Sequence, residues 1–403
     1  MNIVLSDETI DTIRTDLREH HAELYRKAYS DSESREVLKS VLLAKHKNII
    51  DSEEKAESVL REIVGFSFIE DLIEDNRITD IGFNGTDLIV EGNGISKYKI
   101  ESVTEADIHK LIAKFANSTN RELTAKDPIL NTSKDRLRLN AVHKQNAPYG
   151  TTMAIRVSRP YLALNEENWN DFAPNYILDF CKAAVKTRSN MIIVGETGTG
   201  KTEFQKTLIS WIPFEERIAL IEGTLEMCIK ELFPDKDIFS WVASNNVTIE
   251  QLISLAGLRS HPVWIIVGEI LGREVYQMLQ GILTGHRFIT TGHAVDARAI
   301  PKRLLGMAKM GYQVDDKMFL DDIYNYVDFG FHLKKRNGRR FLSEIVEFNS
   351  DHTATTVFKQ VITKDGLKPI IGKLSNQFHE RLIEFDCDYE GLPAAPIEEG
   401  IRL

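Results

Sequence analysis

Short apolar runs alternate with helix-length amphipathic segments in the second half of the chain. The runs lie at residues 191–194, 218–221, 263–267 and 288–291. A strand that is buried on both faces of a parallel sheet has this nearly continuous apolar character, and the helices between the strands cover the two faces. Residues 173–350 are therefore predicted to form an α/β domain built on a parallel sheet.

The first 160 residues follow a different pattern. Residues 1–55 contain helical segments rich in Glu, Arg and Lys, which predicts an N-terminal helical region. Strand candidates at 88–91 and 95–98 then flank the Gly-Asn-Gly at 92–94, a strong hairpin signal. Such strands, mixed with amphipathic helices, predict an α+β domain over residues 56–160.

Two further segments complete the predicted organisation. Polar residues at 161–172 predict a linker between the domains, and residues 351–403 are expected to form a C-terminal appendage. Asn337 and Gly338 separate the strand candidates 329–335 and 340–348. An Asn-Gly pair in this setting favours a two-residue hairpin turn.

The composition narrows the class of function. The chain has 403 residues and a formal net charge of −10, and its densest basic stretch is short, at residues 334–340. Because nucleic-acid binding needs clustered Lys and Arg, this balance argues against direct nucleic-acid binding. The three cysteines are far apart, which suits a reducing compartment and argues against a disulfide or zinc framework.

The sequence predicts neither a signal peptide nor a transmembrane helix. Its first residues do not combine a basic segment with an apolar run, so no signal peptide is predicted. No stretch approaches the roughly 18 uninterrupted apolar residues of a transmembrane helix. We therefore expect a cytoplasmic protein that contacts the membrane only through partners.

The strongest motif is a complete GxxxxGK[ST] sequence, which predicts a phosphate-binding loop. Glycines allow the backbone to curl until successive N–H groups point at phosphate oxygens, and the following helix presents its positive end to the same anion. We expect Lys201 to reach the β- and γ-phosphates of ATP and the Thr202 hydroxyl to bind Mg²⁺. The motif consists of Gly195, Glu196, Thr197, Gly198, Thr199, Gly200, Lys201 and Thr202.

An acidic residue follows the apolar run at 263–267, which we expect to adjoin the phosphate-loop strand. This residue, Glu269, is the best candidate for the general base or water-orienting group. Gly268 stands where many P-loop enzymes carry an Mg²⁺-binding Asp. His286 and His293 flank the run at 288–291, and two interpretations stay open for each: a γ-phosphate sensor or a structural hydrogen bond.

Together, these motifs resemble the secretion ATPase superfamily of type II and type IV secretion, conjugation and pilus systems. The resemblance runs from about residue 60 to 348. In the N-terminal part, residues 78–85 are similar to the family's ITDIxxNG segment. Later residues resemble the stretch that supplies the family's nucleotide-facing arginines. This implies that Arg138 and Arg156 are arginine fingers or phosphate contacts, and that Arg159 is a weaker candidate.

The C-terminal part resembles the family's acidic box, Walker B strand and histidine box. Gly223 replaces the Asp of the acidic box, so the role of this box rests on Glu222 and Glu226. Leu271, after the Walker B strand, stands where an Arg is usual. His293 is the histidine of the third motif.

The resemblance implies a RecA-like P-loop core that follows an N-terminal α+β (PAS-like) domain and extra helices. It also implies a homohexameric ring that hydrolyses ATP with Mg²⁺ and acts at the inner face of the cytoplasmic membrane. Its expected partner is an inner-membrane secretion or pilus platform protein. The helical N-terminal region is similar to that of the tight-adherence and conjugative branch.

Two alternatives to a secretion motor remain. The first is a P-loop nucleic-acid motor such as a helicase, against which the acidic charge and the lack of aromatic–basic segments weigh. DNA-stimulated ATPase activity would favour it. The second is a scaffold in which nucleotide locks an assembly without hydrolysis, and Gly223 and Leu271 leave this open. A phosphate-release assay with Mg-ATP separates a scaffold from a motor.

Overall fold

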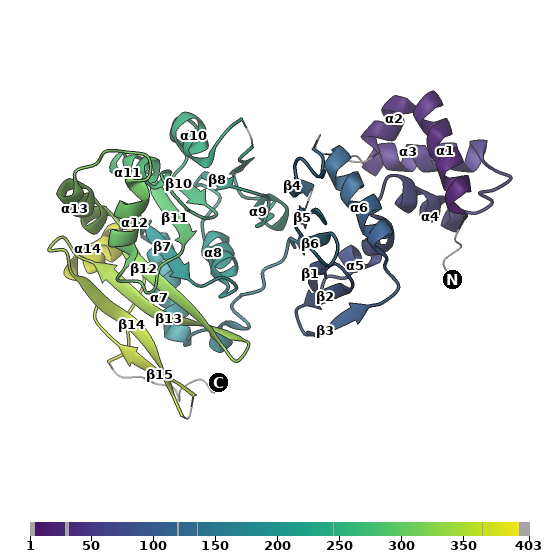
Figure 1. The fold of residues 1–403 in the computed structure, drawn as a ribbon. Coiled ribbons are helices and arrows are strands. Elements are labelled where there is room, and N and C mark those ends of the chain that lie inside the picture. Colours follow the sequence, from purple (N-terminus) through teal and green to yellow (C-terminus); the bar gives the residue numbers. More distant parts are fainter. Residues whose placement is uncertain are drawn as a thin grey trace. The chain divides into compact units, whose positions relative to one another are not determined.

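The computed structural model describes residues 5–28, 32–118, 121–134, 136–244, 246–364 and 366–394. The chain divides into two compact units, Met1–Arg159 (unit 1) and Pro160–Leu403 (unit 2) (Figure 1). Across the described residues, every helix is too short or too polar to cross a lipid bilayer.

Unit 1 begins with a small helical bundle. Its apolar positions form a core of their own, in which Leu17, Leu38 and Leu60 are fully buried. A stretch predicted as polar helices therefore also carries the apolar faces that hold the helices together. The helices are α1 (Asp7–His20), α2 (Ala22–Lys27), α3 (Ser32–Lys45) and α4 (Glu53–Ile63).

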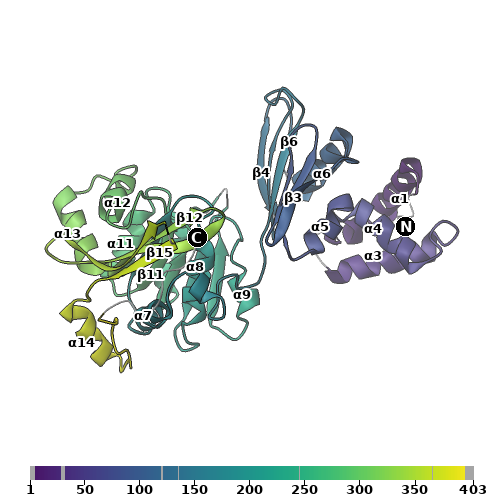
Figure 2. The same cartoon turned by 90° about the horizontal axis from the view of Figure 1, so that it is seen from below.

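The rest of unit 1 is a six-stranded antiparallel sheet with helices on one face. Ile108, Leu111 and Phe115 of helix α6 (Glu105–Ser118) pack on inward-facing residues of the sheet, and Figure 2 shows this helix lying along it. A short 3₁₀ turn, Ser67–Ile69, and α5 (Glu70–Glu74) precede the sheet. The strand order is β3-β2-β1-β6-β5-β4. The strands are β1 (Ile78–Phe83), β2 (Leu88–Gly92), β3 (Ile95–Ile100), β4 (Ile129–Lys134), β5 (Leu137–Val142) and β6 (Thr152–Val157).

Unit 2 is built on a nine-stranded sheet with the order β15-β14-β13-β12-β7-β11-β10-β8-β9. The strands from β12 to β9 in this order are parallel, and β13, β14 and β15 extend the sheet as antiparallel strands. The predicted Asn337-Gly338 turn joins β12 to β13, with both residues at positive φ. The strands are β7 (Met191–Gly195), β8 (Ile218–Glu222), β9 (Ile238–Val242), β10 (Trp264–Val267), β11 (Arg287–Gly292), β12 (Phe329–Arg336), β13 (Arg339–Phe348), β14 (Ala354–Thr363) and β15 (Gly366–Ile371).

Helices cover both faces of this sheet, as the apolar runs predict. Met191 and Ile193 face a core shared with α7 and α8, whereas Ile192 and Val194 face a core shared with α11, α12 and α13. This alternation explains why nearly every strand position is apolar. The α-helices of unit 2 are α7 (Asn175–Lys186), α8 (Lys201–Ser210), α9 (Ile229–Leu232), α10 (Ile249–Gln251), α11 (Val275–Leu283), α12 (Ile300–Ala308), α13 (Asp316–Tyr326) and α14 (Asn376–Glu384). A 3₁₀ turn (Trp169–Asp171), a π-helical turn (Leu252–Ala256) and a second 3₁₀ turn (Gly257–Arg259) complete the unit.

Two segments of unit 2 contribute more to its core than their polar sequences suggest. Residues 161–172, expected as a linker, bury Trp169 and Phe172 against α7 and α8. Residues after 350, expected as an appendage, supply two strands of the main sheet and then α14. Arg381 of α14 donates to the half-buried Asp328 carboxylate over 2.5 Å, which ties this helix to the sheet.

Candidate functional site

The phosphate-loop motif forms the turn between β7 and α8, where the sequence predicts it. Gly200 is the N-cap of α8 with φ of +93°, a conformation that only glycine adopts at low cost. Gly195 has φ of +155°, and a Cβ atom there would lie 2.5 Å from the Leu333 carbonyl oxygen of β12. The loop therefore depends on glycine for its backbone conformation and for its close approach to β12.

Lys201 places its ammonium group inside the curl of the loop. Its Nζ donates to the carbonyl oxygens of Gly195 and Glu196 over 3.0 and 3.1 Å. Burial lowers the pKa of Lys201, and the nearby Glu269 carboxylate opposes this shift. Thr199 closes the turn by donating to the Glu196 carbonyl over 2.8 Å. Thr202, half-buried, follows on the first turn of α8.

The carboxyl ends of three neighbouring parallel strands carry the predicted acidic and histidine residues. Glu222 ends β8, Glu269 follows β10, and His293 follows β11. The expectation that β10 adjoins the phosphate-loop strand is wrong, because β11 lies between β7 and β10. Both β10 and β11 are short and carry no charged residue at their buried positions, so the sequence pattern does not distinguish which of them pairs with β7.

Glu269 and His293 form a pair at the ends of adjacent strands. The His293 Nε2 atom lies 2.9 Å from Glu269 Oε1, and the two side chains are 40% and 39% exposed. Since a carboxylate oxygen accepts, Nε2 donates its hydrogen and leaves the second Glu269 oxygen available. Thr291 fixes the neighbouring backbone by donating from Oγ1 to the Gly268 carbonyl over 2.7 Å. The pair thus presents an oriented, accessible carboxylate.

Glu222 is buried beside the glycine at the Walker B position. Its Oε1 accepts from the backbone N–H groups of Glu226 and Met227, each over 3.0 Å, while its buried Oε2 has no hydrogen-bond partner among the described residues. Burial raises the pKa of Glu222 to about 7 despite these hydrogen bonds. A Cβ atom on Gly268 would lie 3.4 Å from Glu222 Cγ. The Glu222 side chain therefore occupies space beside Gly268, and Glu226 supports it with a backbone amide.

His286 and Leu271, two other residues that the sequence singles out, lie away from the Glu269–His293 pair or at the surface. His286 Nδ1 lies 2.8 Å from the Pro262 carbonyl, at the opposite end of β11 from His293. Leu271 is exposed, and the nearby Arg273 pairs with Glu250 over 2.7 Å. The contact between His286 and the Pro262 carbonyl favours the structural interpretation of this histidine.

Gln205 and Arg340 lie near the phosphate loop but belong to none of the sequence motifs. The buried Gln205 of α8 donates from Nε2 to the Val267 and Ile289 carbonyls over 2.9 and 3.1 Å, and so joins α8 to β10 and β11. Arg340 of β13 donates from Nε to the Gly198 carbonyl over 2.9 Å. A polar residue on the apolar face of α8 is the local signal for Gln205, but no local signal identifies Arg340.

The candidate arginines of unit 1 occupy neighbouring strands. Arg138 of β5 lies directly opposite Arg156 of β6, on the sheet face away from α6. Arg156 Nε lies 3.3 Å from Asp80 Oδ1, and 55% of the Arg156 side chain is exposed. Like charges directly opposite one another are unfavourable in a sheet, and the Asp80 carboxylate lies beside this pair.

Arg159 differs from these two arginines because it is buried within unit 1. It donates to the backbone carbonyls of Asp75 and Ile78, over 2.7 and 2.9 Å from Nη2, and from Nη1 to that of Ile73. These contacts use its guanidinium to hold the segment before β1. A role for Arg159 as a phosphate contact is therefore not favoured.

The sequence matches known proteins over most of its length. A family model described as "Type II/IV secretion system protein" matches residues 127–321. An uncharacterized protein of Bacillus anthracis is 41% identical over 406 residues, covering 95% of this chain and 92% of that protein. Protein VirB11 of Agrobacterium fabrum is 34% identical over 159 residues, which cover 37% of this chain and 45% of VirB11. The chain belongs to the secretion ATPase superfamily.

A solved structure supports the fold of this secretion ATPase family member. A crystal structure of the pilus retraction motor PilT with bound ADP superposes with a TM-score of 0.54 at 17% identity. The match covers 80% of this chain and 87% of the PilT chain. The chain therefore has the predicted RecA-like core preceded by an α+β domain.

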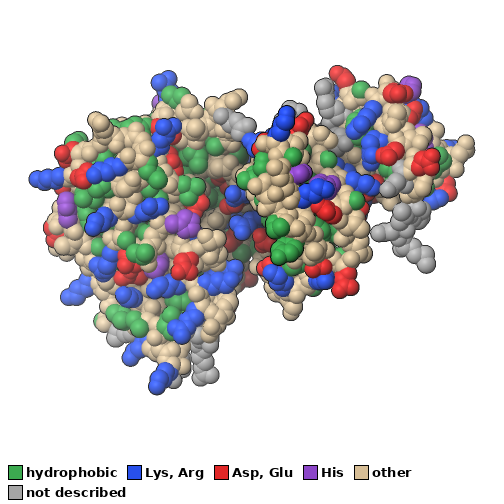
Figure 3. All heavy atoms as spheres, in the orientation of Figure 1, with side chains coloured by type: hydrophobic (Ala, Val, Ile, Leu, Met, Phe, Trp, Pro, Cys, Tyr) green, Lys and Arg blue, Asp and Glu red, His purple; other side chains and the backbone are tan. Residues whose placement is uncertain are grey.

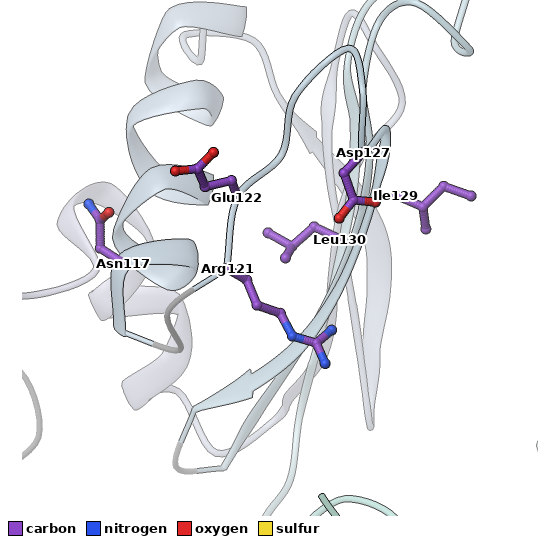
Figure 4. A pocket seen from close by; sticks show the side chains of 6 residues that line it. All are labelled: Asn117, Arg121, Glu122, Asp127, Ile129 and Leu130. Atoms are coloured by element: carbon purple, nitrogen blue, oxygen red, sulfur yellow. The ribbon is translucent and has the colours of Figure 1, made fainter. Parts of the chain in front are cut away.

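A cavity of about 560 Å³ in unit 1 lies apart from the residues of the family motifs. Figure 4 shows Arg121 and Glu122, which follow α6, and Asp127, which precedes β4, around this cavity. Its lining carries both charge signs and includes none of the predicted nucleotide-binding residues. The lining residues are Asn117, Arg121, Glu122, Asp127, Ile129 and Leu130.

Proposed function

We propose that this family member is an ATP-hydrolysing motor that works as a homohexameric ring. In this proposal it powers a bacterial type IV secretion or conjugation machine, or a type II or pilus assembly machine. The observation that carries the proposal is the arrangement of Lys201 inside the phosphate loop with the Glu269–His293 pair at neighbouring strand ends. This arrangement supplies both an anion cradle and an accessible base.

The loop residues fit ATP and Mg²⁺. The backbone N–H groups from Gly195 to Thr202 would hold the phosphates, Lys201 would contact the β- and γ-phosphates, and the Thr202 hydroxyl would contact Mg²⁺. Among the described residues, no group of three His, Cys, Asp or Glu side chains is arranged to hold a metal ion. This fits Mg²⁺, which commonly takes one or two protein ligands together with substrate phosphates and water. When bound, the ion neutralises phosphate charge.

The remaining residues have distinct proposed roles in hydrolysis. Glu269 orients and deprotonates the attacking water, and His293 fixes the Glu269 carboxylate through the 2.9 Å contact. Arg138 and Arg156 stabilise the charge that develops on the γ-phosphate oxygens. Glu222 and Glu226 shape the strand end beside Gly268. Loss of the γ-phosphate then releases the arginine contacts and lets the domains move.

The proposed setting is the cytoplasmic face of the inner membrane. The motor would bind an inner-membrane secretion or pilus platform protein and transmit the domain motion to it. Direct nucleic-acid binding is not part of the proposal, because the chain is acidic, with a net charge of −10.

The proposal is tested by phosphate release from Mg-ATP, with the purified full-length protein. We expect measurable turnover by the wild type and none by Lys201→Ala, which removes the ammonium that the loop encloses. Lys317→Ala, at an exposed site on α13, is the matched control and should match the wild type. Wild-type turnover by Lys201→Ala would exclude the proposed cradle, and a protein with no nucleotide affinity would exclude the motor. Light scattering with and without nucleotide tests the hexamer.

A nucleotide-locked scaffold is the second candidate. It is favoured by Gly223, which replaces the Asp of the acidic box, and by Leu271, which stands where an Arg is usual. A scaffold would bind Mg-ATP and assemble but release no phosphate. The same assay therefore separates the two candidates.

A further inference from the structure

The densest basic stretch of this acidic chain, residues 334–340, forms the end of the β12–β13 hairpin. Strand β12 is parallel to β7, and Leu333 pairs with Gly195, the last residue of β7. The hairpin residues after Leu333 therefore continue past the end of β7, on the side where the phosphate loop begins. In Figure 3, Lys and Arg side chains gather over the region of unit 2 where Figure 1 places β13, β14 and β15.

Arg340 is the hairpin residue that reaches the phosphate loop. Its Nε donates to the Gly198 carbonyl over 2.9 Å. Its Cδ would lie 3.2 Å from a Cβ atom placed on Gly200. The side chain thus crosses the loop between the two glycines whose backbone surrounds the proposed phosphate site.

The charge of Arg340 lacks an acidic partner among the described residues, unlike that of its neighbour. Arg339 lies 2.9 Å from the Asp171 carboxylate, whereas Arg340 uses only Nε, on a neutral carbonyl. Arg340 also pairs in register with Lys335, an exposed cation on β12. Placing like charges opposite one another is unfavourable unless an anion compensates them.

We propose that Arg340 is a nucleotide-binding residue whose guanidinium contacts the phosphate tail of the nucleotide held by the loop of the same chain. This inference rests on the proposed function. A guanidinium suits the task because it can keep Nε on the Gly198 carbonyl while its Nη atoms donate to phosphate oxygens. The ligand class is a nucleoside di- or triphosphate with Mg²⁺.

The test separates the charge of Arg340 from its hydrogen bond to the loop. Calorimetry of the full-length protein would measure affinity for Mg²⁺ with a non-hydrolysable ATP analogue, for Arg340→Lys, Arg340→Gln and Arg340→Ala. Gln can still donate to the Gly198 carbonyl but carries no charge, whereas Lys keeps the charge. We expect Gln and Ala to weaken binding about tenfold, as for loss of one charge-assisted hydrogen bond, and Lys to retain most of the affinity.

Lys368→Ala is the matched control, since it removes an exposed cation on β15 of the same sheet, and its affinity should equal that of the wild type. Wild-type affinity of Arg340→Gln would overturn the inference, because the hydrogen bond alone would then suffice. If the wild type binds the analogue and Lys201→Ala does not, wild-type affinity of Arg340→Gln counts against the role of Arg340 and leaves the proposed function standing. A wild type that binds no nucleotide would instead remove the proposed function. Thermal unfolding of each variant identifies any that fails to fold.

Discussion

The two sets of candidate residues, in unit 2 and unit 1, are held in different ways. In unit 2, Lys201, Glu222 and Glu269 lie at the ends of parallel strands or in the loop that follows one, and each has a hydrogen-bond or ion-pair partner within the unit. In unit 1, Arg138 and Arg156 are direct cross-strand partners on the face of an antiparallel sheet that lies away from α6, and Asp80 is beside them. The unit 2 residues are buried or half-buried, whereas both arginines are exposed.

We propose that this difference gives the two units different roles in hydrolysis. A preorganised loop and base can bind phosphate and activate water without help from other segments. Exposed arginines lose entropy when a ligand orders them, so they suit contacts that form and break during a cycle. Loss of the unit 1 arginines and loss of the unit 2 base should therefore both lower kcat, the arginines by the larger factor.

The largest expected effect is loss of both unit 1 arginines. Arg138→Ala/Arg156→Ala should lower kcat about 1,000-fold, the lower end of the effect of an arginine finger, with little change in nucleotide affinity. Steady-state phosphate release and calorimetry measure the two constants. Lys97→Ala, a cation on β3 of the same sheet, should behave as the wild type. Wild-type turnover by the double variant would make these arginines surface residues and remove the contrast between the units.

The next effect tests the preorganised base. Glu269→Gln should lower kcat by about 100- to 1,000-fold, because the amide cannot take a proton from water. Its amide oxygen can still accept from His293 Nε2, so nucleotide affinity should stay unchanged. Phosphate release and analogue binding by the same preparation measure both properties. Normal hydrolysis would show that another group activates the water.

The sequence predicts the parts of this site that are local in the chain. The phosphate loop, the apolar strands and the Asn337-Gly338 hairpin lie where their short motifs place them, because each motif fixes its own backbone conformation. Strand order is not local, and the sequence gives no basis for placing β11 between β7 and β10.

Sequence motifs also do not predict which residues of neighbouring strands come into contact. Val267 pairs with Ile221, and this register brings the next two residues, Gly268 and Glu222, together. The sequence alone shows a missing Asp at position 268, but not that a neighbouring carboxylate fills the space. Arg340 is 140 residues from Gly200 and reaches the loop only because β12 pairs with β7.

The buried Glu222 predicts a pH-dependent stability. Its pKa is raised to about 7, so the folded state binds its proton more tightly than the unfolded chain does. The contribution of this group to the free energy of unfolding is complete below the ordinary Glu pKa near 4.5 and is lost as pH rises through about 7. Glu222→Gln removes this loss, so at pH 8 the variant should be more stable than the wild type, by on the order of 2 kcal/mol, or a few degrees in Tm.

Thermal unfolding at pH 5.5 and pH 8 tests this prediction for Glu222. The difference in Tm between Glu222→Gln and the wild type should grow as pH rises. Glu215→Gln, which alters an exposed carboxylate of the same unit, should follow the wild type at both values. A constant difference across this range would mean that Glu222 ionises as an ordinary carboxylate and that burial beside Gly268 is not its controlling feature.

The smallest expected effect concerns the two histidines that flank β11. His293→Ala leaves Glu269 in place but removes the donor that orients it, so kcat should fall about tenfold, less than on loss of the base itself. His286→Ala removes only the contact with the Pro262 carbonyl at the other end of the strand and should leave kcat unchanged. Phosphate release by both variants measures the contrast. Equal effects would mean that His293 is also structural and that the Glu269 carboxylate needs no orientation from β11.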